Sequence, residues 1–225
     1  MRRRRACRAA PGPLGLLMLM MVSGATPLQQ QWMVDRAAAL TQGIEFYRRG
    51  RTSRYESHVN MAVRLLRRSI SLDPNHGGVS QSLFYLGASH ALLGDVESAL
   101  EYYHRSLALT PRSAASWRNV GVLYERQQTW NKAADAYRRS AALERENSRQ
   151  ELQQRLALGK VLYNSGRPHD GALEFTRATN IAAQVSPKDL AMIHYKQGRA
   201  EELYGCTGHG VVASNFSAAM SLALR

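Results

Sequence analysis

Residues that could bind a metal or act as nucleophiles are few and scattered along this 225-residue chain. Cys206 and His209 lie close together in a glycine-rich stretch, but two ligands do not complete the four-ligand set of a zinc site. His194 falls on an expected helix, where an imidazole commonly packs against neighbours or faces solvent. The chain contains no phosphate-binding glycine loop, G-x-S-x-G motif or H-E-x-x-H motif. We therefore expect no enzymatic activity, no bound metal and no cofactor.

Four arginines could act together as a ladder for phosphate or carboxylate groups. Each is followed directly by a small residue, and they are Arg68, Arg105, Arg139 and Arg177. A cation beside the small, buried position of a helix normally faces solvent, because its charged end keeps its water. We therefore interpret these arginines as solvent-exposed and not as a binding site.

The first 25 residues carry the pattern of a targeting segment. Five arginines and no acid precede an apolar run at residues 14–22, and Ser23, Gly24 and Ala25 follow it. A cationic head, a short apolar core and a small-residue exit are typical of a signal peptide, here cleaved near Ala25. We expect the secretory pathway (secretion or the ER lumen), with a mitochondrial presequence or an unprocessed tail as alternatives. The apolar run is shorter than the roughly 20 residues of a membrane span, so we expect no membrane span.

The rest of the chain is basic and has the composition of a folded protein. The hydrophobic fraction of the whole sequence, 44%, supports a sizeable core and excludes a disordered chain. Without the five N-terminal arginines, 25 basic and 17 acidic residues leave a net charge of +8. Such a surface favours acidic peptides, anionic head groups or nucleic acid. Nucleic-acid binding rests on this charge alone, and we do not expect it.

Past the targeting segment the chain has one cysteine, Cys206, so an internal disulfide is excluded there. Asn215 begins a sequon, which would be glycosylated only in the secretory pathway.

Four segments of the chain share a glycine followed twelve positions later by a small residue. Two antiparallel helices approach closely only where both lack bulk, so each pair predicts a helix crossing. Gly94 and Gly166 lie between the expected helices, where a helix often ends. The four pairs are Gly50 with Ala62, Gly87 with Ala99, Gly121 with Ala133, and Gly159 with Gly171.

The successive glycines of these pairs are 37, 34 and 38 residues apart. This spacing resembles the tetratricopeptide repeat, a helix–turn–helix unit of about 34 residues. The segment at residues 80–111 is most similar, whereas the fourth has Arg155 at the usual aromatic position. The resemblance predicts an all-α protein, a right-handed α-solenoid (superhelix) of stacked antiparallel helix pairs. Four pairs are expected over residues 34–183, with a degenerate or truncated fifth over 187–225.

The resemblance also implies that the first helices of the pairs line a concave surface that binds extended peptides. We therefore expect a non-catalytic scaffold or adaptor that binds a protein or peptide; the sequence indicates no oligomeric state. Arginine and aromatic side chains often anchor interfaces, and here an acidic ligand or a free carboxylate would suit them. The candidate peptide-binding residues are Tyr47, Arg51, Arg54, Phe84, Arg118, Lys160, Tyr163, Tyr195 and Arg199.

An alternative function belongs to a different class. The expected fifth pair ends on an apolar face, without the polar capping helix that solenoids need for solubility. If the chain is a fragment of a longer protein, it would be the N-terminal substrate-recognition arm of a larger enzyme, for example a glycosyltransferase or sulfotransferase.

Overall fold

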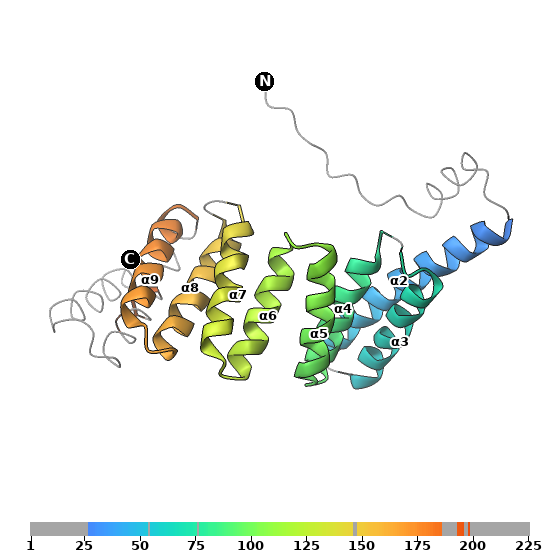
Figure 1. The fold of residues 1–225 in the computed structure, drawn as a ribbon, viewed down its shortest axis with the longest axis horizontal. Coiled ribbons are helices and arrows are strands. Elements are labelled where there is room, and N and C mark those ends of the chain that lie inside the picture. The colour runs from blue at the N-terminus through green and yellow to red at the C-terminus, as the bar shows by residue number, and fades with distance from the viewer. Residues whose placement is uncertain are drawn as a thin grey trace, which may run out of the picture. The chain divides into compact units, whose positions relative to one another are not determined.

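The computed structural model describes residues 27–53, 55–75, 77–145, 148–185, 193–195 and 198. Regular secondary structure in these residues is entirely α-helical (Figure 1). The chain divides into two compact units, residues 1–82 and 83–225, and the boundary lies inside α4. The helices are α2 (Pro27–Ser53), α3 (Glu56–Leu72), α4 (Val79–Leu92), α5 (Val96–Leu109), α6 (Ala114–Arg126), α7 (Trp130–Leu143), α8 (Arg149–Asn164) and α9 (Pro168–Val185).

The first unit is an antiparallel pair formed by α2 and α3. The side chains of Leu66 and Ala62 are fully buried in it. At one end of the pair, Nη1 of Arg36 donates to a carboxylate oxygen of Asp73 at 2.8 Å. Since Asp73 directly follows α3, the part of α2 before Arg36 extends past the end of α3. Helix α2 also begins earlier than expected, at Pro27, a residue type suited to the first turn of a helix.

The close contact predicted between Gly50 and Ala62 is wrong. A Cβ atom on Gly50 would lie 2.5 Å from Cγ2 of Val59, which is nine residues later and not twelve. The reason is a short turn, because α2 continues to Ser53 and α3 already begins at Glu56. The glycine therefore meets the first turn of α3.

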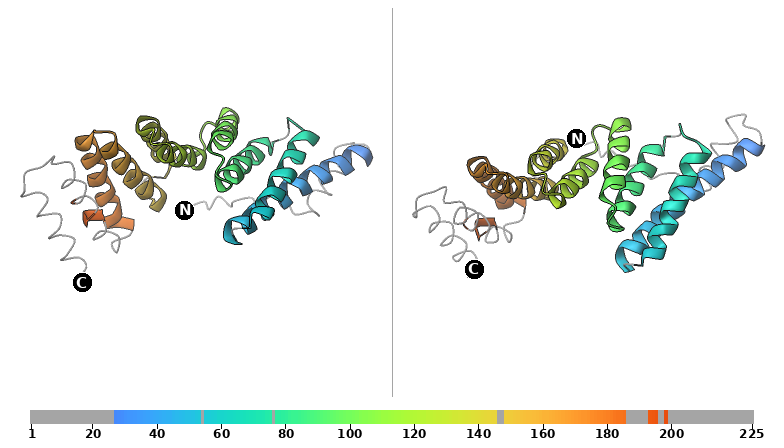
Figure 2. Two further views of the ribbon diagram at one scale, coloured as in Figure 1. Left: turned by 90° about the horizontal axis from the view of Figure 1, so that it is seen from below. Right: turned by 60° about the horizontal axis from the view of Figure 1, so that its bottom comes forward.

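In the second unit, α6 to α9 follow one another as antiparallel neighbours (Figures 1 and 2). Leu158, Val161 and Leu162 of α8 are buried against Ala133 and Tyr137 of α7. Side-chain caps begin several of the helices, since backbone amides of the first turn donate to oxygens of Asp95, Ser113 and Ser148. The hydrogen bonds from Ser98 hold the pKa of the Asp95 carboxyl below its ordinary value.

The glycines of the second unit face aromatic rings sixteen residues later. Cβ atoms on Gly87, Gly121 and Gly159 would lie 3.0, 2.9 and 3.2 Å from the rings of Tyr103, Tyr137 and Phe175. The same Cβ atoms on Gly87 and Gly159 would also lie 3.1 and 3.2 Å from the backbone oxygens of Ala99 and Gly171. The twelve-residue spacing therefore marks close helix contact at these two glycines, and a large ring of the second helix fills the space beside the crossing.

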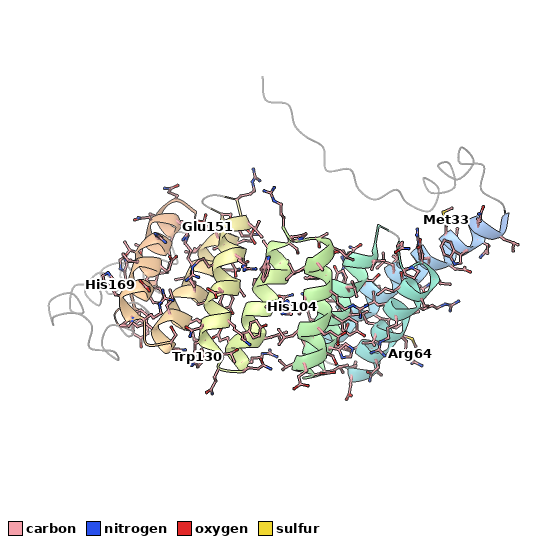
Figure 3. All side chains as sticks on the ribbon, in the orientation of Figure 1. Met33, Arg64, His104, Trp130, Glu151 and His169 are labelled. Carbon is pink, nitrogen blue, oxygen red and sulfur yellow. The ribbon has the colours of Figure 1, made fainter. Side chains whose placement is uncertain are left out.

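A cluster of charged side chains lies between α8 and α9, where the family pattern has an aromatic residue. Arg155 donates to Glu151 at 2.9 Å and to Glu174 at 2.9 Å. Both glutamates are 8% exposed. The second oxygen of Glu174 accepts from Arg177, so the two buried carboxylates share two guanidinium groups. Figure 3 shows Glu151 on α8.

The three turns inside the helix pairs of the second unit have one geometry. In each, one residue has positive φ: 83° for Gly94, 55° for Gln128 and 76° for Gly166. These residues lie seven positions after Gly87, Gly121 and Gly159. The next amide, in Asp95, Thr129 or Arg167, bonds the carbonyl five residues back. This is the Schellman arrangement, in which glycine is preferred because a Cβ disfavours positive φ.

Gln128→Gly should raise the free energy of unfolding by about 1 kcal/mol, because it removes a side chain from the left-handed region. Urea unfolding followed by circular dichroism measures the change. The matched variant, Gly166→Ala, should lower the free energy of unfolding by about as much. A loss of stability in Gln128→Gly would show that the glutamine side chain contributes more than its strain costs.

Within the described ranges, no helix combines the length and the apolar character needed to cross a membrane. Of the expected fifth pair, residues 193–195 are helical, and Ile193 is buried against Leu152 and Ala178. The expected targeting segment at residues 1–25 lies outside the described residues, as does the rest of the fifth pair apart from Gly198.

Candidate functional site

The first helices of the second unit, α4, α6 and α8, carry the candidate binding residues of that unit. We call one surface of these helices the first-helix face. It is defined by the positions three residues before, one after and four after Gly87 on α4, Gly121 on α6 and Gly159 on α8. The two helices α6 and α8 are joined across it by an ion pair. The face consists of Phe84, Ala88, Ala91, Arg118, Val122, Glu125, Leu156 and Lys160. Tyr163 occupies the last position of the stripe, but its side chain is buried.

Glu125 is the centre of the polar contacts on this face. Its Oε1 accepts from Nζ of Lys160 at 2.7 Å, and its Oε2 accepts from the hydroxyl of Tyr137 at 2.9 Å. Tyr137 comes from α7 and is 2% exposed. Burial, followed by the hydrogen bond to Glu125, raises the pKa of Tyr137 well above its ordinary value. The hydroxyl is therefore a permanent donor at neutral pH, and it fixes the carboxylate.

Arg118 lies one helical turn before Val122 on α6 and is half-buried. Its positive charge acts on the hydroxyl of Tyr137 and favours the ionised form, against the larger effect of burial. Among the described residues, no side chain forms an ion pair with its guanidinium. This charge is thus placed on the face without a counter-ion in the described part of the chain.

The α4 end of the face is aromatic and packed. The ring of Phe84 lies 5.6 Å from that of Tyr103, edge to face. The hydroxyl of Tyr103 accepts from Nδ2 of Asn119 at 2.9 Å, which connects α5 to α6. Sequence reasoning missed Asn119 and the hydrogen bonds that the hydroxyls of Tyr103 and Tyr137 make with first helices.

Tyr163 was predicted as a binding residue, and this prediction is wrong. Its side chain is 2% exposed and lies against Gly171 and the ring of Phe175. Because Gly171 has no Cβ, the Tyr163 ring turns between α8 and α9 instead of toward the face. The Lys160 prediction needs a refinement, since its ammonium already binds Glu125.

The other predicted residues belong to other elements or fall outside the described ranges. Tyr47 and Arg51 belong to α2 in the first unit, where Tyr47 is half-buried and Arg51 is exposed. Tyr195 is 49% exposed. The predictions for Arg54, Arg199, Asn215, Cys206 and His209 concern residues outside the described ranges.

The four arginines that each precede a small residue, Arg68, Arg105, Arg139 and Arg177, lie on second helices. The last three contact neighbouring side chains. The guanidinium of Arg139 lies 4.6 Å from the centre of the Trp117 ring, and that of Arg105 lies 5.7 Å from Tyr102. Arg177 binds Glu174 as described above. These contacts do not gather the arginines into one anion site. In the described part of the chain, no group of three or more His, Cys, Asp or Glu side chains could hold a metal ion.

Comparison with known proteins agrees with this architecture. The sequence profile of the tetratricopeptide repeat matches residues 86–148. The photosystem I assembly protein Ycf3 of Rippkaea orientalis is 30% identical over 86 residues, which are 38% of this chain and 50% of that protein. The same protein of Acaryochloris marina is 30% identical over 80 residues, or 36% and 48% of the two chains. The chain thus spans about half the length of the curated relatives it matches.

Solved structures of MamA share the fold. MamA of Desulfovibrio magneticus RS-1 superposes with a TM-score of 0.65 at 16% identity, covering 83% of this chain and 96% of that one. MamA of strain AMB-1 gives a TM-score of 0.66 at 21% identity, with 85% and 93% covered. These similarities show the fold class, an all-α, right-handed α-solenoid of stacked antiparallel helix pairs.

Proposed function

We propose, from the premise that this chain is a tetratricopeptide-repeat protein, that it is a non-catalytic scaffold whose first-helix face binds a segment of another protein. Proteins with this fold act as protein-binding scaffolds, and the assembly role in the name of Ycf3 is in keeping with such a function. The observation that carries the finer proposal is Arg118, a cation on the face with no acidic partner among the described side chains. A ligand carboxylate would supply that partner through a charge-assisted hydrogen bond.

Arg118→Glu should weaken capture of the ligand at least about tenfold, since a charge-assisted hydrogen bond is replaced by repulsion. The immobilised protein would be incubated with secretory-pathway extract, and captured proteins quantified by mass spectrometry. Arg138→Glu on α7 is the matched control, because it makes the same charge change at an exposed side chain of a second helix. Equal capture by the wild type and both variants would exclude the face as the binding site.

The location proposed for this scaffold is the secretory pathway, with the mitochondrion as the alternative. The support is the sequence of residues 1–25, in which arginines precede an uninterrupted apolar run. A reporter carrying N-glycosylation sequons and fused after residues 1–30 should be glycosylated and exported. Leu17→Arg with Met20→Arg should abolish export by interrupting the apolar run, and import of the unchanged fusion into mitochondria would contradict the proposal.

A further inference from the structure

We infer that Glu125 masks Lys160, so that α6 and α8 together present one receptor for a ligand carboxylate and not two. The ligand class selected in this way is a segment with a single acidic residue next to an aliphatic side chain, instead of a strongly acidic segment. The inference rests on the proposed function of the first-helix face, and it assigns a specificity role to Glu125.

The contacts of Glu125 show why it stays in place. Its side chain is 22% exposed, whereas that of Lys160 is 64% exposed. The buried hydroxyl of Tyr137 holds one carboxylate oxygen at 2.9 Å, and Lys160 holds the other at 2.7 Å. If a ligand drew Lys160 away, Glu125 would keep its bond to Tyr137. Its negative charge would remain on the face and repel a second ligand carboxylate.

Charge therefore differs between the two basic positions of the face. At Lys160 the ammonium is neutralised by Glu125, which lies on the neighbouring first helix. At Arg118 no described side chain neutralises the guanidinium, and its planar donors suit a bidentate carboxylate. A ligand with one acid gains this contact without competing with a carboxylate of the chain, while an additional acid near Lys160 meets Glu125.

The apolar part of the selected ligand follows from Val122. This residue lies between Arg118 and Glu125 on the α6 stripe and is 37% exposed. Leu156, one turn before Lys160 on α8, is half-buried. An aliphatic side chain next to the ligand acid would cover part of this surface and gain by leaving water.

The test uses fluorescent ten-residue synthetic peptides that contain one leucine and one, two or three aspartates. Wild type should prefer the peptide with one aspartate. Glu125→Gln should bind the peptide with two aspartates about fivefold more tightly than wild type does, as expected for removing one partly exposed charge. The amide oxygen of the variant can still accept from Tyr137, so folding should be retained. Glu101→Gln, which removes an exposed glutamate paired with Arg105 on α5, is the matched control and should change nothing.

The double variant Glu125→Gln/Lys160→Gln decides whether the gain comes through Lys160. The inference requires that the gain of Glu125→Gln disappear in this variant, whereas its persistence overturns the inference. A wild type that prefers three aspartates to one also overturns it.

The reactivity of Lys160, measured without peptide, tests whether Glu125 masks this lysine independently of the proposed binding function. The lysines of the chain are Lys132, Lys160, Lys188 and Lys196, so acetylation by an N-hydroxysuccinimide ester is easily assigned by mass spectrometry. Relative to Lys132, Lys160 should react several-fold faster in Glu125→Gln than in wild type. Equal rates would overturn the mask. If no form binds any peptide but Lys160 reacts faster in the variant, the mask stands and the proposed function fails.

Discussion

Arg155→Met is expected to lower the free energy of unfolding by about 3 kcal/mol. The variant removes the guanidinium that both Glu151 and Glu174 share, at 2.9 Å from each. Both glutamates are 8% exposed, so water cannot replace the lost partner fully. Arg177 still binds Glu174 in the variant. Urea unfolding of wild type and variant at pH 7 measures the difference.

Two further variants separate this cause from a general loss of packing. Removing all three charges with Glu151→Met, Arg155→Leu and Glu174→Met should recover most of the stability, because no buried charge is left unpaired. Arg138→Met breaks an exposed pair with Asp135, and it should cost less than about 1 kcal/mol. A triple variant as unstable as Arg155→Met would mean that the methylene stem of Arg155 matters, and not its charge.

Arg155 also shows where sequence-based prediction stops. Its departure from the aromatic pattern was visible in the sequence, and Glu151 lies one helical turn before it, within reach on the same helix. Glu174 comes from α9, and nothing local identifies it as a partner. The repeat period predicts which helices touch, but the side chains that meet across a contact depend on sizes at several positions at once.

The first helix pair was mispredicted for a related reason. Gly50 is followed twelve positions later by a small residue, as are the glycines of the other segments. The position of a turn, however, is set by where the first helix ends. Since α2 continues to Ser53 and α3 begins at Glu56, the turn is shorter and Val59 meets Gly50. Glycine spacing alone does not contain this information.

On the first-helix face, the orientation expected for Tyr163 was wrong. Counting along the helices placed Glu125 and Tyr163 at equivalent positions, four residues after the glycine. Glu125 stays at the face because the hydroxyl of Tyr137 reaches it. Tyr163 turns inward because its partner helix has Gly171 where the neighbouring pairs have alanine. The twelve-residue pairs therefore encoded a side-chain orientation as well as a helix crossing.

Gly171→Ala is expected to lower the free energy of unfolding by about 2 kcal/mol, although alanine is the better helix former by about 1 kcal/mol. A Cβ there would lie 2.5 Å from Cδ2 of the Tyr163 ring and 2.9 Å from the backbone oxygen of Gly159. The ring is buried and cannot move aside into solvent. Thermal or urea unfolding measures the loss. Gly77→Ala is the matched control, because nothing lies within 4 Å of its Cβ position, and it should change stability little.

The decisive comparison is the effect of Gly171→Ala in a chain that already carries Tyr163→Ala. Tyr163→Ala alone should be destabilising, because it empties a buried space beside Phe175. In that background the new methyl group no longer meets the ring, so Gly171→Ala should become neutral or stabilising, and the coupling should be about 2 kcal/mol. An unchanged penalty would assign the strain to the approach of the α8 and α9 backbones at Gly159. A reversal of sign would show that the glycine is required by the buried tyrosine, whose ring packs between α8 and α9 and not on the first-helix face.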